Sequence, residues 1–236
     1  MEKERNGFQA WLYGRWGPLG RSLGFWLREV VYPEGALCCT CGRLSDGEPL
    51  CADCRQRLRE DGFAFAWDYA EPCPGVSAWG LRPHEGIHRT LVLRLKYGAE
   101  SRAAGLLASL VLPLPEGLSF PPDTVVTWVT MPPSRLRDRG IDHGRLLAEA
   151  VAENLSLPCR PLLLRRETRQ KSQVSLSASG RTANLKNAFE PLEAVHFPVL
   201  LVDDVRTTGT TIARCAEALR RGGATRIFAL TMTFGK

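Results

Sequence analysis

The stretch that decides the fold is VLLVDDVRTTGTTIARCAEALRRGG, residues 199–223. Its first four residues, 199–202, are an apolar run of the kind that forms a buried parallel strand. The acidic pair Asp203 and Asp204 follows where this run stops, and residues 207–211 form a loop of threonines and one glycine. Apolar residues then recur at helical spacing up to a pair of glycines, which would end the helix. The segment therefore predicts a core strand that turns directly into a helix.

The turn between this strand and this helix is suited to binding a phosphate. A strand that leads tightly into a helix points free backbone N–H groups at one place, and the positive end of the helix dipole adds to them. The two carboxylates can accept hydrogen bonds from the vicinal hydroxyls of a ribose and can help to hold a divalent metal. The alternative is an ordinary turn with solvated aspartates, which does not need two acids and four threonines. The pattern predicts a ribose 5-phosphate site where open α/β sheets bind ligands.

The same segment resembles the phosphoribosyl pyrophosphate (PRPP) motif of type I phosphoribosyltransferases, which is an apolar strand, two acids and a T-T/S-G-x-T loop. The resemblance implies an α/β fold with an open parallel sheet flanked by helices. It also implies PRPP with magnesium as the ligand, and Asp203 and Asp204 as catalytic residues. The residues that it implies for PRPP binding are Asp203, Asp204, Arg206, Thr207, Thr208, Gly209, Thr210 and Thr211.

With 236 residues, the chain is long enough for one full domain and a small module, or for two modest domains. Its composition, with 44% hydrophobic and 24% charged residues, is ordinary for a soluble globular protein. The formal net charge is +6, and residues 160–186 account for all of it, with seven lysines and arginines against one glutamate. This basic segment is either a solvated loop or a loop that meets phosphates or nucleic acid.

Two cysteine pairs lie near the N-terminus, Cys38-x-x-Cys41 and Cys51-x-x-Cys54. Each pair can place two thiolates on one metal ion, and together they complete the tetrahedral shell of a structural zinc site in a zinc-ribbon-like module. The alternative is four reduced cysteines that only pack. We find neither a secretory leader nor an apolar run long enough to span a membrane, so we expect a cytoplasmic protein that is not integral to the membrane. The thiols expected to be buried and inert are those of Cys73, Cys159 and Cys215, and Cys39, next to the first pair, is expected to be a bystander and not a ligand.

A second phosphate-binding element is expected after a predicted strand over residues 125–130. A loop stiffened by prolines and carrying arginines follows, and arginine forks pair well with phosphate oxygens. Lys96, at the end of a predicted helix over residues 87–97, could reach the same phosphates or simply favour the helix C-terminus. A solvated basic turn is the alternative for the loop. The candidate pyrophosphate-binding residues are Pro132, Pro133, Ser134, Arg135, Arg139 and Lys96.

Four regions are expected along the chain: an apolar and aromatic helix region over 1–32, the zinc module over 33–60, a connecting helical or hood region over 61–122, and the phosphoribosyltransferase-like core over 123–236. The helix of residues 1–32 either packs against a neighbour or lies on a membrane surface or a partner. The basic and serine-rich stretch 165–188 has the length and composition of a mobile lid. Such a lid would keep water from a reaction that must avoid hydrolysis.

Together these features resemble the ComF/GntX-like competence family, whose members carry a zinc-binding module before a type I phosphoribosyltransferase domain. The resemblance covers residues 33–236. Apart from the cysteine pairs and the acidic motif, it rests on Leu95-Lys96-Tyr97-Gly98, Pro132, Arg139-Gly140, Thr168, Gln173, Leu176, Arg181, Asn184 and Phe189. The lid residues that it implies are Arg166, Thr168, Gln173, Arg181 and Asn184. The chain departs from the family at Ile141-Asp142-His143, because R-G-F-N-Q is common there and this chain has no amide.

The resemblance implies a role in natural transformation, in handling incoming single-stranded DNA at the inner face of the membrane together with other DNA-uptake proteins. Two hypotheses follow. In the first, the protein is an enzyme that transfers phosphoribosyl from PRPP to an unknown acceptor and releases pyrophosphate. In the second, it is a non-catalytic accessory protein that binds PRPP or single-stranded nucleic acid. The sequence identifies no acceptor, and the fold class does not decide between the two hypotheses.

Overall fold

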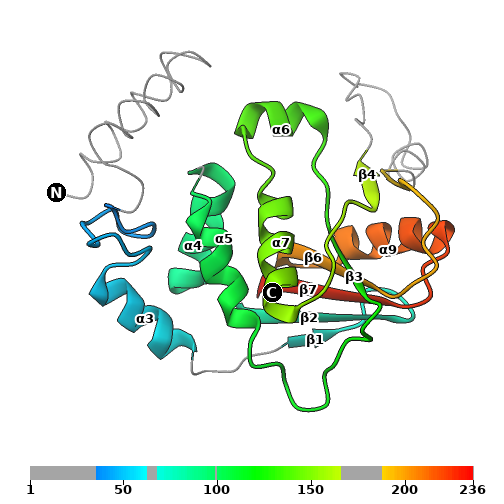
Figure 1. Cartoon of the computed structure of the whole chain (residues 1–236), viewed down its shortest axis with the longest axis horizontal. Coiled ribbons are helices and arrows are strands. Elements are labelled where there is room, and N and C mark those ends of the chain that lie inside the picture. The colour runs from blue at the N-terminus through cyan, green and yellow to red at the C-terminus, as the bar shows by residue number, and fades with distance from the viewer. Residues whose placement is uncertain (1–35, 63–67, 99, 166–187, 236) are drawn as a thin grey trace. The chain divides into compact units, whose positions relative to one another are not determined.

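Figure 1 shows the computed structural model of the chain, which describes residues 36–62, 68–98, 100–165 and 188–235. The chain forms two compact units, Met1–Arg55 and Gln56–Lys236. The predicted helix region of residues 1–32 lies outside the described residues. So do the predicted lid residues Arg166, Thr168, Gln173, Arg181 and Asn184.

In the first unit, the described chain folds around the two cysteine pairs. A tight turn brings the Cys38 N–H within 2.7 Å of the Arg43 carbonyl oxygen, to which it donates. Gly42 lies inside this turn with a φ of 73°, a backbone conformation that glycine adopts without steric cost. Helix α3 (Ala52–Gly62) begins directly after Cys51, so the second cysteine pair lies at the start of this helix.

The second unit is built on a five-stranded sheet in the order β1-β2-β7-β6-β3. Of the strands in this sheet, β2, β7, β6 and β3 are parallel, whereas the edge strand β1 is antiparallel to β2. The strand bounds are β1 (Asp68–Ala70), β2 (Val76–Pro83), β7 (Ile227–Phe234), β6 (Val199–Arg206) and β3 (Val125–Trp128). Residues 199–202 of β6 are fully buried, as their apolar run predicts. The arrangement confirms the predicted α/β fold with a parallel sheet.

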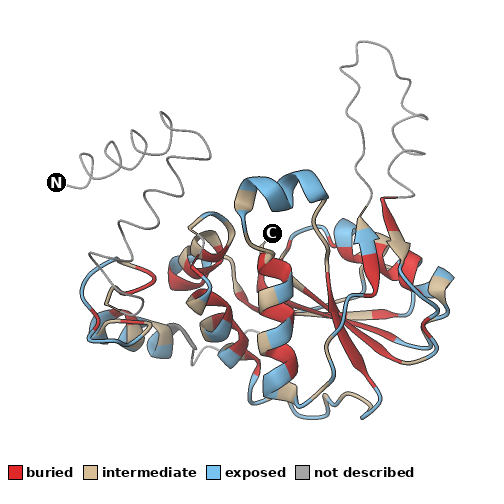
Figure 2. Cartoon of the chain, turned by 45° about the horizontal axis from the view of Figure 1, so that its top comes forward, coloured by how far each residue is buried: buried red, intermediate tan, exposed pale blue. Residues whose placement is uncertain are grey.

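Helices cover both faces of this sheet (Figure 1). On one face, α7 (His143–Leu155) packs on β3 and β6, α5 (Arg102–Ala108) packs on α7, and α4 (Gly86–Tyr97) packs on α5. A 3-10 turn, η1 (Ser109–Val111), follows α5. On the other face, α9 (Thr210–Gly222) lies beside an antiparallel ladder of β4 (Leu163–Arg165) and β5 (Phe189–Pro191). Figure 2 shows buried residues along the sheet and the inner sides of these helices. No helix among the described residues has the length and apolarity needed to cross a bilayer.

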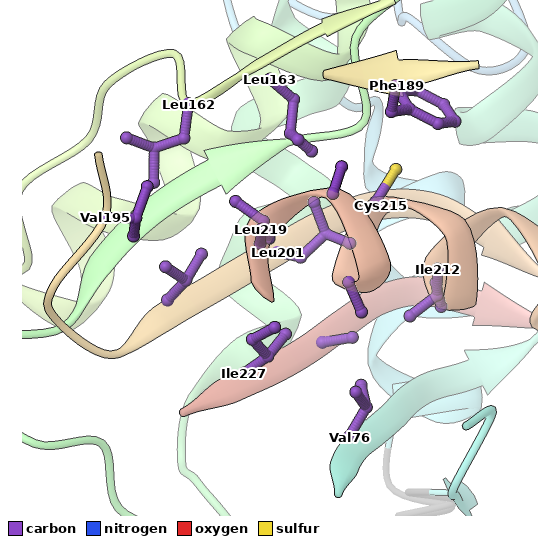
Figure 3. Close-up of a cluster of buried hydrophobic side chains, with 14 of the residues drawn as sticks. Val76, Leu162, Leu163, Phe189, Val195, Leu201, Ile212, Cys215, Leu219 and Ile227 are labelled. Carbon is purple, nitrogen blue, oxygen red and sulfur yellow. The ribbon is translucent and has the colours of Figure 1, made fainter. Parts of the chain in front are cut away.

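Helix α9, which follows the acidic pair, packs on a cluster of buried hydrophobic side chains (Figure 3). Ile212, Cys215 and Leu219 on its inner side are fully buried and pack in one cluster with Leu201 and Ile227 of the sheet. The other labelled members of this cluster are Val76, Leu162, Leu163, Phe189 and Val195. Full burial of a leucine or isoleucine side chain contributes about 1.5–3 kcal/mol. Several such side chains therefore fix α9 against β6, and the loop that joins them has both ends anchored.

Two elements differ from the expectations drawn from the sequence. β6 does not stop before Asp203 but continues to Arg206, because β7 pairs with it as far as Arg206 and Phe234. Residues 133–139, expected as a loop, form helix α6 (Pro133–Arg139). A proline at the first position starts this helix readily, and Gly140 ends it at a φ of 75°. The helix buries no residue, so it has no apolar period that a sequence pattern could reveal.

The region 61–122, expected to connect the zinc module to the core, supplies two strands of the core sheet. β2 pairs with β7 along its whole length, from Val76 to Pro83. Gly80 within β2 is required by packing, because a Cβ there would lie 2.7 Å from the Cβ of Phe234. The boundary between the two compact units falls between Arg55 and Gln56.

Candidate functional site

Polar side chains gather where the parallel strands of the sheet end. The carboxyl ends of parallel strands meet at one edge, which is where open α/β sheets bind their ligands. β6 contributes Asp203 and Asp204, and β7 contributes Thr233, whose hydroxyl donates to the Asp204 carbonyl oxygen at 3.1 Å. His84 follows β2, and its Nδ1 lies 2.9 Å from the Thr233 hydroxyl. The sheet therefore brings groups from three strands to the position that the sequence predicts for a ligand.

The acidic pair is split between the two faces of the sheet. Asp203 and Asp204 lie within a regular strand, in which successive side chains point to opposite faces. Asp204 points to the face of α4 and α7, where its Oδ1 lies 2.8 Å from the Lys96 Nζ and its Oδ2 lies 3.2 Å from the His143 Nε2. Burial alone would raise the pKa of Asp204, but the hydrogen bond from His143 and the charge of Lys96 lower it overall. Asp204 is thus held as a buried carboxylate.

Asp203 has different surroundings. It is half-buried, and within the described residues it forms no ion pair, although its Oδ1 accepts the Asp204 N–H at 2.9 Å. Burial and the adjacent charge of Asp204 raise the pKa of Asp203 to about 8. The charge of Arg165, at the end of β4, acts on Asp203 in the opposite direction. Sequence reasoning placed Arg165 only within a basic segment. The signal that could have located it was the apolar run of residues 162–164 directly before it.

The loop between β6 and α9 is open to a ligand. Thr207, Thr208, Thr210 and Thr211 are all exposed around the buried Gly209. The hydroxyls of Thr208 and Thr210 lie 2.8 Å apart, and Gly209 caps α9 at a φ of 73°. A Cβ on Gly209 would lie 2.8 Å from the Cβ of Pro72, so the loop also needs glycine for close packing. Four exposed hydroxyls at a helix N-terminus are the donors that a phosphate group requires.

Arg206 belongs to the predicted PRPP-binding residues, and the structure gives its side chain another environment. The guanidinium is buried, pairs with the carboxylate of Asp68 on β1, and donates to the Asp68 carbonyl oxygen at 3.3 Å. It also lies over the Phe234 ring, 5.9 Å from the ring centroid. Arg206 therefore ties the edge strand β1 to the end of β6.

The predicted pyrophosphate-binding residues are divided by the structure. Pro132 precedes α6, while Pro133, Ser134 and Arg135 are exposed on it. Arg139, the last residue of α6, reaches the acidic edge, because its Nη1 lies 3.2 Å from the Nδ1 and 3.3 Å from the Nε2 of His143. Arg139 and Lys96 are therefore brought together around His143 and Asp204, whereas Arg135 is exposed and its charge acts on Arg165 instead.

The departure at residues 141–143 has a structural explanation. Asp142 caps α7, accepting the Arg145 N–H at 3.1 Å on Oδ1 and the Trp128 indole N–H at 3.2 Å on Oδ2. His143, the first residue of α7, then reaches Asp204. Sequence reasoning missed His143 as a site residue, and the departure itself was the signal that could have identified it.

The four predicted metal ligands of the first unit lie in one cluster. The Sγ atoms of Cys38, Cys41, Cys51 and Cys54 are all within 4.8 Å of one another, and those of Cys41 and Cys51 are 3.7 Å apart. Tetrahedral zinc with bonds of about 2.3 Å to sulfur separates its ligands by about 3.8 Å. Burial disfavours a thiolate at Cys38, but hydrogen bonds from the backbone of Cys41 and Cys51 and from Thr40 lower its pKa to about 6. The cluster could hold a four-coordinate metal ion.

The two aspartates should change stability in opposite directions with pH. The fold favours protonated Asp203, so its contribution to stability is lost as the pH rises from the ordinary value of 3.8 through about 8. Asp203→Asn should therefore become increasingly stabilising, relative to wild type, up to about pH 8. Asp204 has a lowered pKa, so Asp204→Asn should destabilise at neutral pH and lose this effect in acid. Urea unfolding across this pH range measures both effects, and a pH-independent Asp203→Asn difference would contradict the first.

Gly209→Ala should destabilise the protein more than Gly140→Ala. The two glycines have nearly the same φ, 73° and 75°, so a side chain costs about 1–2 kcal/mol at either from backbone strain. A Cβ at Gly140 meets nothing within 4 Å, whereas one at Gly209 meets Pro72. Urea unfolding of both variants separates the clash from the strain, and equal losses would show that the Pro72 contact does not constrain the loop.

Comparison with known proteins places the chain among curated relatives, although no protein-family model matches it. DNA utilization protein YhgH of Salmonella typhi is 35% identical over 200 residues, which cover 81% of this chain and 87% of the relative. The protein of the same name from Escherichia coli strain K12 is 28% identical over 214 residues, covering 86% and 92%. Competence protein F of Haemophilus influenzae is 37% identical over 93 residues, covering 38% and 41%.

Solved structures with a similar chain path include two proteins named for phosphoribosyl chemistry. Orotate phosphoribosyltransferase from Aeropyrum pernix matches with a TM-score of 0.32 and 22% identity, over 75% of this chain and 78% of that one. Glutamine PRPP amidotransferase from B. subtilis matches with a TM-score of 0.37 and 20% identity, over 64% and 29%. These similarities are low, so the assignment rests on the sequence relatives. Because the Salmonella typhi relative is 35% identical over most of both chains, the chain belongs to the ComF/GntX-like competence family that its motifs predict.

Proposed function

We propose that the carboxyl edge of the sheet binds PRPP. The observation that carries this proposal is one continuous strand–turn–helix unit with Asp203, which has no ion-pair partner among the described residues, at one end and four exposed threonines at the other. The threonine loop would hold the 5-phosphate through its hydroxyls and the N–H groups of α9. Asp203 would accept hydrogen bonds from the ribose diol. Asp204, already bound to Lys96 and His143, would take part through the cations that it holds in place.

The pyrophosphate of PRPP would meet the cations on the α4 and α6 side of this edge. Lys96 and Arg139 lie there beside Asp204, and Arg135 is exposed on the same helix as Arg139. Arginine forks and a lysine ammonium are suited to the oxygens of a diphosphate. A carboxylate without an ion-pair partner among the described residues, such as that of Asp203, fits a magnesium ion, which would neutralise part of the ligand's charge when bound. The arrangement thus offers a separate group for each part of the ligand.

As an enzyme, the protein would transfer phosphoribosyl to an acceptor. The bond between the anomeric carbon and the pyrophosphate oxygen would break, and the pyrophosphate would leave with the electron pair. The acceptor would supply the electron pair for the new bond. Ionised Asp203 would stabilise the positive charge that develops on the ribose, so catalysis would consist of positioning and charge stabilisation.

Calorimetric titration with PRPP and magnesium tests this proposal directly. Wild-type protein should bind, and Asp203→Asn and Asp204→Asn should each weaken binding by more than about tenfold, because each removes a charge-assisted contact. Asp123→Asn is a matched control, since Asp123 is exposed and lies at the opposite end of the sheet, before β3. Absence of binding to the wild type, or equal binding by all three variants, would refute the site.

Pyrophosphate release in the same samples separates transfer from binding. Release that depends on an added acceptor would identify the protein as a transferase. If the wild type and Asp123→Asn bind PRPP, the two site variants do not, and no acceptor causes pyrophosphate release, the result favours the second candidate function, a PRPP-responsive accessory protein.

The second candidate is favoured by the names of the relatives, which are a DNA utilization protein and a competence protein. In this function the protein would bind single-stranded nucleic acid in DNA uptake, and the exposed arginine helix α6 would contribute contacts to phosphates. Such binding weakens steeply with salt, because each phosphate contact releases counterions. A labelled single-stranded oligonucleotide, titrated at several salt concentrations, distinguishes it from the transferase function.

We further propose that the four-cysteine cluster holds zinc. Four thiolates at tetrahedral spacing suit zinc, and they leave no open position for chemistry, so the ion would stabilise the first unit only. Purified protein should contain about one zinc per chain. Cys51→Ser should lose most of the metal, whereas Cys73→Ser, outside the cluster, should retain it. Mass spectrometry of the metal content decides, and equal zinc in both variants would exclude this cluster as the site.

A further inference from the structure

His143 connects two parts of the site that are far apart in sequence. Its Nε2 lies 3.2 Å from the Oδ2 of Asp204, and its ring lies within 3.3 Å of the Nη1 of Arg139. Arg139 in turn lies over the ring of Tyr97, 5.1 Å from the ring centroid. Lys96, which precedes Tyr97 in the chain, pairs with the other oxygen of Asp204, with its Nζ 2.8 Å from Oδ1. We call these five residues the His143 network, and they come from α4, α6, α7 and β6.

The Arg139 guanidinium approaches the face of the His143 imidazole. Its Nη1 is almost equally far from the two ring nitrogens of His143, at 3.2 Å and 3.3 Å. A guanidinium that donated in line with one ring nitrogen would lie clearly farther from the other. The contact is therefore with the flat face of the imidazole, and Tyr97 offers a second aromatic ring to the same group. A guanidinium is attracted electrostatically to the face of an aromatic ring.

His143 is itself held firmly in place. It is buried and is the first residue of α7, directly after the Asp142 cap. The next residue is Gly144, where a Cβ would lie 3.2 Å from the Trp128 side chain and 3.2 Å from the Val129 carbonyl oxygen. The start of α7 is thus pressed against the end of β3, and this close approach fixes where the imidazole can reach.

By contrast, the helix that carries Arg139 has no buried face. α6 buries no residue, and its remaining arginines, Arg135 and Arg137, are exposed. The described contacts of Arg139 are with the rings of Tyr97 and His143 and with Met131, whose sulfur lies 3.6 Å from the Arg139 Nη1. The buried His143 at the start of α7 therefore gives the charge of Arg139 a fixed partner.

We propose that His143 is a positioning residue that aligns Asp204 with one ring nitrogen and fixes Arg139 with its ring face. This role rests on the proposed function only in one respect, namely that Asp204 and Arg139 contribute to PRPP binding. His143 would not touch the ligand. It would fix the distance between the carboxylate edge and the arginine helix, so that ribose and pyrophosphate contacts are set together.

Two substitutions separate the two contacts of His143. His143→Gln keeps a donor that can reach Asp204 but has no aromatic ring, whereas His143→Ala removes both contacts. Tyr97→Leu removes the second ring from a mostly exposed position and leaves the Asp204 contacts in place. Arg145→Ala is the matched control on α7, because Arg145 is exposed and its side chain pairs with Glu149 instead.

The first readout needs no PRPP. Phenylglyoxal modifies accessible arginines, and peptide mass spectrometry compares Arg139 with Arg135 on the same helix. In wild type and Arg145→Ala, Arg139 should react several-fold more slowly than Arg135. His143→Ala, His143→Gln and Tyr97→Leu should each raise the Arg139 rate toward that of Arg135. An unchanged Arg139 rate in folded His143→Gln and Tyr97→Leu protein would overturn the role of the two rings in holding Arg139, even if His143→Ala failed to fold.

The second readout is the affinity for PRPP with magnesium. His143→Ala should lose about tenfold, the scale of one hydrogen bond to a buried charge, and His143→Gln should recover part of this loss. Equal affinities of the Gln and Ala variants would overturn the Asp204 role. If wild-type protein does not bind PRPP, the proposed function fails, while the arginine reactivity still decides whether His143 fixes Arg139.

Discussion

The parallel pairing of β6 with β7 beyond the end of β3 is the constraint on which the site depends. β3 pairs with β6 only as far as Val202, but β7 continues to pair with it through Arg206. The acidic residues therefore lie in a regular strand rather than in a loose turn. Regular strand geometry sends adjacent side chains to opposite faces. One strand thus delivers Asp204 to the helices α4 and α7, and Asp203 to the side of α9 and β4.

This separation gives two chemically identical side chains different states. Asp204 meets Lys96 and His143, so its charge is compensated and its pKa lowered. Asp203 has no such partner among the described residues, and burial next to a fixed negative charge raises its pKa. The difference arises from which helices cover each face. The two side chains are the same, so the difference between their pKa values comes from their surroundings alone.

The strand, the acidic pair, the threonine loop and α9 were predictable from sequence because each is a local pattern. The four-cysteine cluster was predictable for the same reason, since ligand spacing alone implies a common metal. Other features depend on residues distant in the chain. Arg206 pairs with Asp68, 138 residues away, so the PRPP-binding role expected from its place in the motif could not be judged locally.

The remaining differences have the same origin. β2 contains Gly80, which weakens a strand pattern but is needed because Phe234 approaches closely. Helix α6 has no buried face, so the rule that reveals helices by apolar period cannot apply to it. His143 could be noticed only as a departure from the family pattern, and its partners Asp204 and Arg139 come from two other elements, β6 and α6.

The charge state of the acidic edge also bears on how a polyanion could bind there. Two ionised aspartates beside a phosphate loop would repel PRPP. This repulsion would be reduced, because Lys96 compensates the charge of Asp204 and the pKa of Asp203 is raised to about 8 by burial and by the adjacent Asp204. Ribose hydroxyls and a magnesium ion both favour the ionised carboxylate. A ligand that carries both would therefore displace the Asp203 proton as it binds, so the negative charge would form only when a diol and a cation are present to stabilise it. A phosphate without a diol or a magnesium ion would contact the threonine loop but not an ionised Asp203. This difference in contacts would let the site discriminate PRPP–magnesium from simpler phosphates.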